Sequence, residues 1–259
     1  MFKCFYVFIL GAIIGSFLNV VIFRLRAKKS FLKGRSYCPK CKKKIAWYDN
    51  IPILSFLILR GKCRNCKTKI SFQYPLVELS TGVLFVITFF HNYQLPITNY
   101  QLPITVFRDW FFVSVLIIIF VYDFKYYLIL DKITIPAIII AFALNFSLGF
   151  SLSNILIGAI IGGNFFLIQF LISKGRWIGG GDIRLGILMG VMLGWKMVIL
   201  AIMIAYIVGA IFSIILLAFK KKGLKSQIPL GTFLSIATMI VMLYGNEILE
   251  WYLKTLIVY

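Results

Sequence analysis

Long apolar stretches, separated by short segments rich in lysine and arginine, dominate the hydropathy pattern of the chain. Because about 20 apolar residues cross the hydrocarbon layer of a bilayer as a helix, stretches near this length predict transmembrane helices. The stretch 183–219 is too long for one crossing, and it divides most naturally at Gly194-Trp195-Lys196 into a short helix and a full one. The pattern therefore predicts about eight transmembrane helices. They cover the two parts of that stretch together with 5–23, 76–90, 110–122, 133–150, 155–172 and 228–244.

The composition supports this interpretation and excludes several classes of protein. Hydrophobic residues make up 61% of the 259 positions, whereas a soluble domain has about 45–50%. The 28 basic residues far exceed the 8 acidic ones, but they lie in islands between apolar stretches and not on a water-soluble scaffold. We therefore predict an all-α polytopic membrane protein. A secreted soluble domain, a disordered tail protein and a nucleic-acid-binding module are excluded, so no nucleic-acid partner is expected.

The distribution of basic residues predicts the orientation in the membrane, because cytoplasmic loops carry an excess of lysine and arginine. With the amino terminus outside, 24 of the 28 basic residues fall in inside loops. The four that remain outside are Lys3, Arg108, Lys196 and Lys254. The chain is thus expected in the inner (cytoplasmic) membrane, with residues 26–75 in the cytosol. The basic residues of this loop also predict contact with anionic lipid headgroups.

Two cysteine pairs lie in this loop, and 21 residues separate them: Cys38 with Cys41, and Cys63 with Cys66. Two Cys-x-x-Cys pairs at such a spacing are typical of a zinc ribbon, in which four thiolates surround the metal tetrahedrally. Cytosolic thiols stay reduced, so structural disulfides are not expected. A closed Cys4 site is structural and leaves no position for substrate. The alternatives are four unligated cysteines or a redox pair.

Three aspartates fall at or within the predicted membrane boundaries, and an ionisable residue there is a functional-site hypothesis. Asp182 ends a run of three glycines and opens a helix, whose amino terminus stabilises an anion. Asp123 follows Asp109, at the outer end of its span, by 14 residues, or about 21 Å along a helix. Both are therefore expected at one depth near the cytoplasmic face. Asp131, about two turns further on, is expected in the interfacial loop.

Two carboxyl groups at one depth in a low-dielectric site cannot both ionise comfortably, so one keeps a proton. One can then act as base on a water while the other donates to a scissile carbonyl group, as in aspartic proteases. We therefore predict Asp123 and Asp182 as a catalytic pair that needs no metal. The alternative interpretation pairs each aspartate with a nearby base such as Lys125 or Arg184.

A set of motifs in this order along the chain resembles the type IV prepilin peptidases, which are membrane aspartic proteases with a Gly-x-Gly-Asp motif. The resemblance rests on the cysteine pairs and on 15–25 (GSFLNVVIFRL), 59–63 (LRGKC), 74–78 (YPLVE), 123–131, 179–185 (GGGDIRL) and 228–231 (IPLG). The catalytic aspartates of that family map onto Asp123 and Asp182. The chain departs from the family pattern at Leu130 and Thr232, where the family has proline, and at Arg184, where it has lysine.

The resemblance implies an endopeptidase that removes the basic leader from type IV prepilins and pseudopilins at the cytoplasmic face. Members with the cysteine loop typically also methylate the new amino terminus, with S-adenosylmethionine as donor. Gly61 matches the glycine that the family associates with methyl transfer. No glycine-rich dinucleotide fingerprint is found, so the residues themselves do not locate the donor.

Three alternative functions remain open on the sequence. A presenilin-like protease and a preflagellin-type peptidase, both without methylation, are disfavoured by the cysteine pairs. An ion-coupled transporter with proton-relay aspartates would leave the predicted zinc ribbon unexplained. The predicted domains are a first transmembrane helix (1–25), a zinc-binding loop domain (26–75) and a transmembrane peptidase core (76–259).

Overall fold

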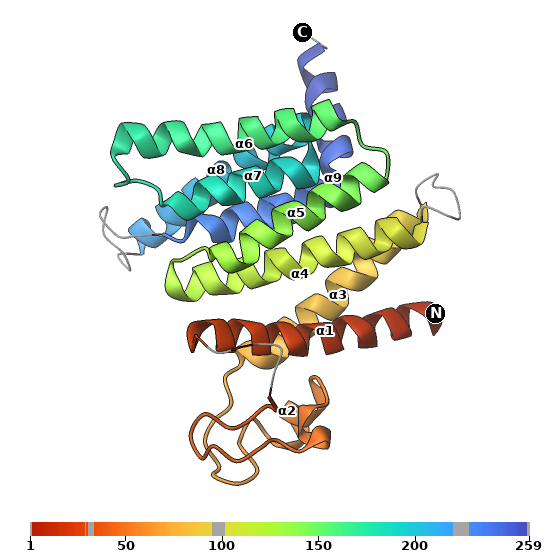
Figure 1. Ribbon diagram of the computed structural model, residues 1–259, viewed down its shortest axis with the longest axis vertical. Helices are drawn as coiled ribbons and strands as arrows, with labels where there is room; N and C mark the ends of the chain where they lie inside the picture. The colour runs from red at the N-terminus through yellow and green to blue at the C-terminus, as the bar shows by residue number, and fades with distance from the viewer. Residues whose placement is uncertain (1, 29, 31–33, 95–101, 220–227, 258–259) are drawn as a thin grey trace. The chain divides into compact units, whose positions relative to one another are not determined.

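A computed structural model of the chain describes residues 2–28, 30, 34–94, 102–219 and 228–257 (Figure 1). Within these ranges the chain forms helices and loops, and the only β-structure is two isolated bridges. The predicted all-α fold class is confirmed. The elements are α1 (Phe2–Arg26), η1 (Trp47–Asn50), α2 (Leu54–Ile58), α3 (Gln73–Gln94), α4 (Leu102–Tyr126), α5 (Asp131–Ser147), α6 (Leu152–Ser173), α7 (Gly180–Leu193), α8 (Trp195–Ala218) and α9 (Leu230–Ile257).

Six of the described helices are long and apolar enough to cross a membrane, namely α1, α3, α4, α6, α8 and α9. They match six of the eight predicted crossings, so the multi-pass architecture is confirmed. The other two predicted crossings form the shorter helices α5 and α7, of 17 and 14 residues. At 1.5 Å per residue, α7 is about 21 Å long, shorter than the ~30 Å hydrocarbon layer. The ends of α7 therefore need partners for their backbone groups inside the protein.

The break between α7 and α8 falls at Gly194, as the sequence predicted. Gly194 has a φ of +78°, and a Cβ atom there would lie 2.6 Å from the side-chain nitrogen of Asn154. Two asparagines bind the backbone groups that the break leaves unpaired. Asn145 Nδ2 donates to the carbonyl oxygen of Val191 at 2.7 Å, and Asn154 Oδ1 accepts the N–H of Trp195 at 3.2 Å. The backbone groups at this end of the short helix thereby have partners within the protein.

The chain divides into two compact units, residues 1–97 and 98–259. In the first unit α1 packs against α3, and the cysteine loop connects them. Glycine allows this close packing, because a Cβ atom at Gly15 would lie 2.8 Å from the Cα atom of Glu78. The predicted boundaries at residues 25 and 75 stay a prediction, since both lie inside this unit.

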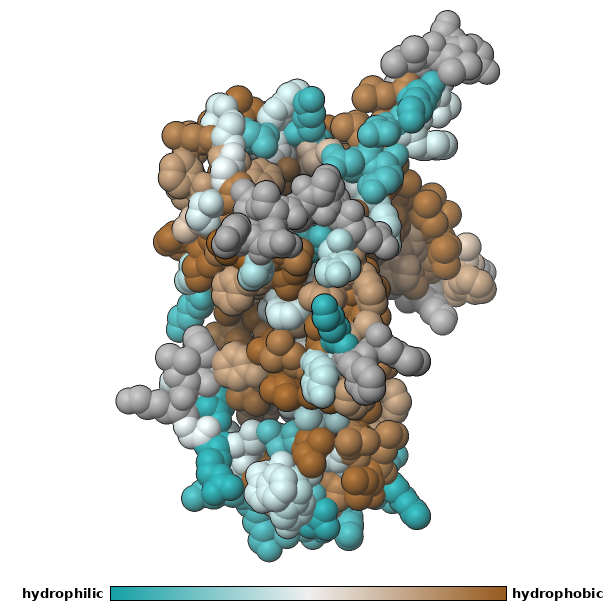
Figure 2. All heavy atoms as spheres, turned by 90° about the vertical axis from the view of Figure 1, so that its right-hand side faces the viewer, coloured by the Kyte–Doolittle hydropathy of each residue, from teal (hydrophilic) through white to brown (hydrophobic). Residues whose placement is uncertain are grey.

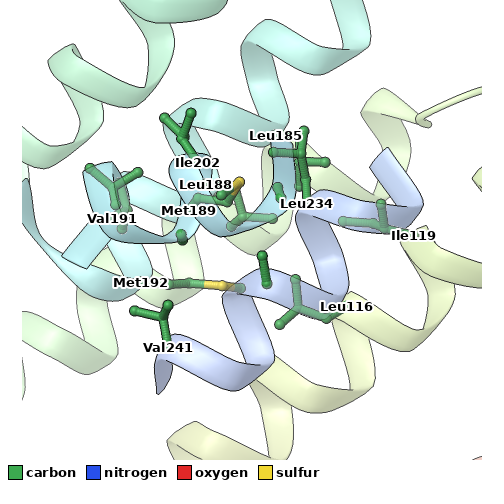
Figure 3. Close-up of a cluster of buried hydrophobic side chains, with 14 of the residues drawn as sticks. Leu116, Ile119, Leu185, Leu188, Met189, Val191, Met192, Ile202, Leu234 and Val241 are labelled. Carbon is green, nitrogen blue, oxygen red and sulfur yellow. The ribbon is translucent and has the colours of Figure 1, made fainter. Parts of the chain in front are cut away.

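The second unit contains α4 to α9 around one hydrophobic core. Figure 3 shows part of this core, to which four helices contribute side chains, among them Leu116 of α4, Leu188 of α7, Ile202 of α8 and Leu234 of α9. α7 packs against α5, α6, α8 and α9, so that half of its residues are buried and the others are partly buried. The short helix is thus held on several sides within the unit.

Glycines on α6 and α7 let these two helices approach backbone to backbone. A Cβ atom at Gly162 would lie 2.1 Å from the carbonyl oxygen of Gly186, and one at Gly190 would lie 2.0 Å from that of Gly158. The glycines are four residues apart on each helix, which is the small-xxx-small pattern of packed transmembrane helices. No larger residue fits at these positions without separating α6 from α7.

Apolar side chains cover much of the helical surface visible in Figure 2, and hydrophilic ones are frequent over the cysteine loop at the bottom of that view. On α8, for example, Ile207, Ile211 and Ile214 are each more than half exposed. Exposed apolar surface of this extent is typical of a face that contacts lipid.

We predict that Gly190→Ala destabilises the protein, because its Cβ atom would overlap the backbone of α6. Overpacking of this kind costs about 1–3 kcal/mol, and it is measured as a lower midpoint of thermal unfolding in detergent. The matched control is Gly209→Ala in α8, where the nearest atom to the new Cβ would be 3.6 Å away. A similar midpoint for both variants would contradict the proposed backbone contact.

Candidate active site and metal centre

Asp123 lies in the last turn of α4, and only 5% of its surface is exposed. Its Oδ2 atom accepts two hydrogen bonds from Thr232, one from the backbone N–H at 2.9 Å and one from the hydroxyl group at 3.3 Å. Thr232 belongs to the first turn of α9. The carboxyl group therefore faces the amino terminus of a helix, where free N–H groups and the helix dipole favour an anion.

Asp182 lies in the first turn of α7, directly after the three glycines. Its Oδ2 atom accepts a hydrogen bond from the backbone N–H of Gly179 at 2.9 Å. The predicted position at a helix amino terminus is confirmed. Each of the two aspartates is thus placed at the amino terminus of a helix, Asp123 at α9 and Asp182 at α7.

Ile129, in the loop between α4 and α5, joins the surroundings of the two aspartates. A Cβ atom at Gly181 would lie 2.9 Å from the Cβ atom of Ile129, and one at Gly231 would lie 3.0 Å from both Ile129 Cδ1 and Asp123 Oδ2. The starts of α7 and α9 therefore pack on the same isoleucine. The carboxyl groups of Asp123 and Asp182 lie close enough to interact electrostatically.

The basic residues named as alternative partners do not pair with these aspartates. Arg184 forms an ion pair with Asp131, at the first turn of α5. None of the ion pairs found among the described residues includes Asp123 or Asp182. Asp131 was expected in the interfacial loop, but it is the first residue of α5, where an acidic side chain favours helix formation.

This arrangement suits acid–base chemistry by two carboxyl groups. Neither group is neutralised by a cation of the described residues, and both have hydrogen-bond donors from helix termini. Because the charge of Asp123 disfavours ionisation of Asp182, one group can be a base while the other keeps a proton and acts as an acid. The sequence did not predict the donation by Thr232, because Thr232 is 109 positions away from Asp123. One feature of the sequence could have indicated this contact, namely the threonine at 232 where the family has proline. Unlike proline, threonine has a backbone N–H and a hydroxyl group that can donate hydrogen bonds.

The two Cys-x-x-Cys segments in the first unit fold in the same way. The backbone N–H of Lys42 donates to the carbonyl oxygen of Cys38 at 2.9 Å, and that of Lys67 donates to Cys63 at 3.0 Å. Both lysines have a φ of 57°, and an isolated antiparallel bridge flanks each turn. The loop therefore presents two similar turns, each with a pair of thiol groups.

The sulfur atoms of the four predicted cysteines form one cluster, within 4.8 Å of one another. Cys38 Sγ and Cys66 Sγ are 3.8 Å apart, far longer than a disulfide bond of about 2.05 Å. The hydroxyl group of Thr68 lies 3.2 Å from Cys66 Sγ, and this contact lowers the pKa of the Cys66 thiol. It therefore favours the thiolate, which is the form that binds metal. The cluster can hold a metal ion.

Gly61 lies between α2 and the second cysteine turn, with a φ of +66°. A Cβ atom there would lie 3.1 Å from the ring of Phe56, and the Gly61 N–H donates to the Phe56 carbonyl oxygen at 2.9 Å. Any larger residue would both strain the backbone and displace this ring. The structure thus links Gly61 to the position of Phe56.

Comparison with known proteins gives two matching family models. The model described as "Bacterial Peptidase A24 N-terminal domain" matches residues 9–92, and that described as "Type IV leader peptidase family" matches residues 110–214. Together they include both aspartates and all four clustered cysteines. No solved structure matches the chain.

Relatives named "Prepilin leader peptidase/N-methyltransferase" match over most of their length. The protein from Aeromonas salmonicida is 31% identical over 97% of this chain and 94% of its own. The protein from Bacillus subtilis is 32% identical over 95% of this chain and 96% of its own length. The protein from Vibrio cholerae is 38% identical over 73% of this chain and 77% of its own length. The chain therefore belongs to the type IV leader peptidase family.

Proposed function

We propose that the protein is a membrane aspartic endopeptidase that removes the basic leader from type IV prepilins and pseudopilins, with Asp123 and Asp182 as its catalytic pair. The observation that carries this proposal is the position of both aspartates at helix amino termini, close to one another and without a cation partner among the described residues. The family to which the chain belongs supports a peptidase. The names of the relatives support prepilins as the substrate.

We assign the base to Asp123, because two hydrogen bonds from Thr232 stabilise its ionised form. Asp182 then carries the shared proton. Asp123 takes a proton from a water whose oxygen bonds to the scissile carbonyl carbon, while the proton of Asp182 moves to the carbonyl oxygen. The tetrahedral intermediate collapses when the C–N bond breaks and its nitrogen takes the proton held by Asp123. The hydroxyl proton of the intermediate returns to Asp182.

The charge of the chain supports the orientation that we propose in the inner membrane. With the amino terminus outside, 24 of the 28 basic residues lie in cytoplasmic loops, and in this orientation we propose that the cysteine loop and the catalytic aspartates face the cytoplasm. This face is where a basic leader, which stays in the cytosol, meets the apolar stem of a pilin. Contact of the basic loop with anionic headgroups agrees with the same orientation.

The metal of the cysteine cluster is proposed to be zinc, in a structural role. Four thiolates at a Zn–S distance of about 2.3 Å form a tetrahedron with sulfur atoms about 3.8 Å apart. The observed separation of Cys38 Sγ and Cys66 Sγ is 3.8 Å. The donor set and this spacing therefore fit zinc, which would hold the two cysteine turns of the loop together.

Methylation of the new amino terminus, with S-adenosylmethionine as donor, is the second proposed activity. It is supported by the relatives' names and by the match of the amino-terminal family model to residues 9–92, which contain Gly61 and the cysteine cluster. The same match disfavours a presenilin-like or preflagellin-type protease without methylation. Membership of a peptidase family disfavours an ion-coupled transporter.

We predict that Asp123→Asn and Asp182→Asn each lower the rate of prepilin cleavage by about 10³-fold or more, because each removes one half of the acid–base pair. The rate is measured by mass spectrometry of a prepilin incubated with the purified protein. Asp131→Asn is the control, since Asp131 is half exposed and pairs with Arg184, and its loss is expected to change the rate by less than about threefold. Near-normal cleavage by either of the first two variants would remove that residue from the mechanism.

Thr232→Val removes one hydrogen-bond donor to Asp123 and keeps the backbone N–H in place. Loss of a hydrogen bond to a charged group costs about 1.5–3 kcal/mol, so we expect kcat to fall at least about tenfold while KM changes little. Thr232→Ser restores the hydroxyl group and is expected to restore kcat. Equal kcat values for the valine and serine variants would contradict the positioning role of this hydroxyl group.

Freshly purified protein is expected to contain about one zinc ion per chain, measured by inductively coupled plasma mass spectrometry. Cys66→Ser removes one of the four clustered thiols and should lower the zinc content several-fold. The matched control is Cys4→Ser, because Cys4 lies in α1 outside the cluster and should leave the zinc content unchanged. A wild-type content far below one ion per chain would argue against the zinc site.

A further inference from the structure

A cavity of about 470 Å³ lies within the first unit, between the ends of α1 and α3 and the cysteine loop. Its volume falls in the range of about 300–1,000 Å³ that is typical of small-molecule sites. Neither of the two proposed catalytic aspartates lines it, because Asp123 and Asp182 belong to the second unit.

Five of the residues that line the cavity are aromatic. Phe23 of α1 and Tyr37 of the loop meet edge to face, with 6.3 Å between ring centroids. Phe56 and Tyr74 line the same space. Rings arranged in this way can pack against a planar heterocycle such as a purine base.

One acidic side chain of the wall is buried without a cation partner. Glu78 of α3 is 7% exposed, and it takes part in none of the ion pairs found among the described residues. The other acidic lining residue, Asp49, is already neutralised, because Arg64 Nε and Nη2 bind its two oxygens at 2.8 and 2.6 Å. A cationic ligand in the cavity would therefore meet no competing ion-pair partner at Glu78.

Glu78 also fixes the loop over the cavity. Its Oε2 atom accepts the backbone N–H of Ile53 at 2.7 Å. Ile53 has φ +62° and ψ −53°, and the N–H of Leu54 donates to the carbonyl oxygen of Pro52 at 2.6 Å, which closes a γ-turn. This turn is rare and strained for a β-branched residue. Strained turns held by side-chain contacts are frequent at ligand sites.

We propose that this cavity binds the methyl donor, with the purine base of S-adenosylmethionine among the aromatic rings and its sulfonium group facing Glu78. The inference rests on the proposed methyltransferase activity. Lys43 and Lys44, two exposed lysines that line the cavity, can form ion pairs with the carboxylate group of the methionine moiety of S-adenosylmethionine. The cavity thus offers both signs of charge and an aromatic wall, as this ligand requires.

This assignment gives Gly61 a physical role as a positioning residue. Gly61 does not line the cavity, but a Cβ atom there would displace the ring of Phe56, which does. In the reaction, the lone pair of the uncharged pilin amine forms a bond to the methyl carbon as the C–S bond breaks. The electron pair of that bond stays on sulfur, and the methylated amine releases a proton to water. The site needs no residue of the catalytic aspartate pair.

The test measures equilibrium binding of tritiated S-adenosylmethionine to the full-length protein in nanodiscs, together with prepilin cleavage and zinc content. Val20 lines the cavity from α1, and Val20→Trp should fill it and weaken binding at least about tenfold. The matched control is Ile13→Trp on the same helix, where the side chain is 51% exposed and lies outside the cavity. Both variants are expected to keep normal cleavage and normal zinc content, which shows that the protein is folded.

A second variant tests the charge of Glu78. Glu78→Gln keeps an oxygen that can accept the Ile53 N–H, so the turn is preserved while the charge is lost. It should weaken binding of S-adenosylmethionine about tenfold, and binding of S-adenosylhomocysteine, which lacks the sulfonium charge, much less. Equal loss for both ligands would overturn the proposed contact between Glu78 and the sulfonium group.

The outcomes separate this inference from the proposed peptidase function. Unchanged donor binding by Val20→Trp would overturn the assignment of the cavity. Wild-type protein that cleaves prepilin but does not bind the donor would also overturn it, and it would leave the peptidase function intact. Donor binding that is lost only in the cavity variants, in a protein that cleaves no prepilin, would support the cavity and refute the peptidase function.

Discussion

A carboxylate inside a bundle of apolar helices is stable only where donors or positive charge replace the water that it has lost. In the second unit, helix amino termini supply this replacement. Asp123 binds the first turn of α9, and Asp182 binds the N–H that precedes α7. Because no cation of the described residues pairs with either group, the two acids remain available to share a proton. The proposed acid–base chemistry is possible because the partners of both carboxyl groups are helix amino termini and not cations.

The same constraint explains the packing around the aspartates. For α7 and α9 to begin next to each other, both must pack on Ile129, and glycine is needed at 181 and 231 to make room. The shortness of α7 has a related cause. It ends within the unit because Asn145 binds its last carbonyl groups and Gly194 turns the chain into α8. The close glycine contact with α6 then fixes the helix that carries Asp182.

The two proposed activities use different parts of the chain. The proposed cleavage uses the pair of aspartates in the second unit, whereas the proposed methylation is assigned to a cavity in the first unit. A metal at the cysteine cluster would serve the second activity indirectly, because Cys38 and Cys63 also line the cavity. The metal would hold in place the loop that forms one wall of the cavity.

The sequence alone determined the features that depend on local pattern. Hydropathy predicted an all-α membrane protein, the three glycines placed Asp182 at a helix start, and the break at Gly194 was predicted and is confirmed. The spacing of the cysteines identified four residues that do form one cluster. Each of these signals lies within one short segment, where helix period, glycine content or ligand spacing carries the information.

Only the tertiary structure decided which distant residues meet. The bonds from Thr232 to Asp123 and from Ile53 to Glu78 join residues 109 and 25 positions apart. The sequence likewise did not predict that Arg184 would pair with Asp131 and not with Asp182. Such contacts depend on how whole helices pack against one another. The hydropathy pattern around the two residues does not show which partner each of them will contact. The cavity beside Glu78 has the same origin, since its wall comes from two helices and a loop that meet only in the folded chain.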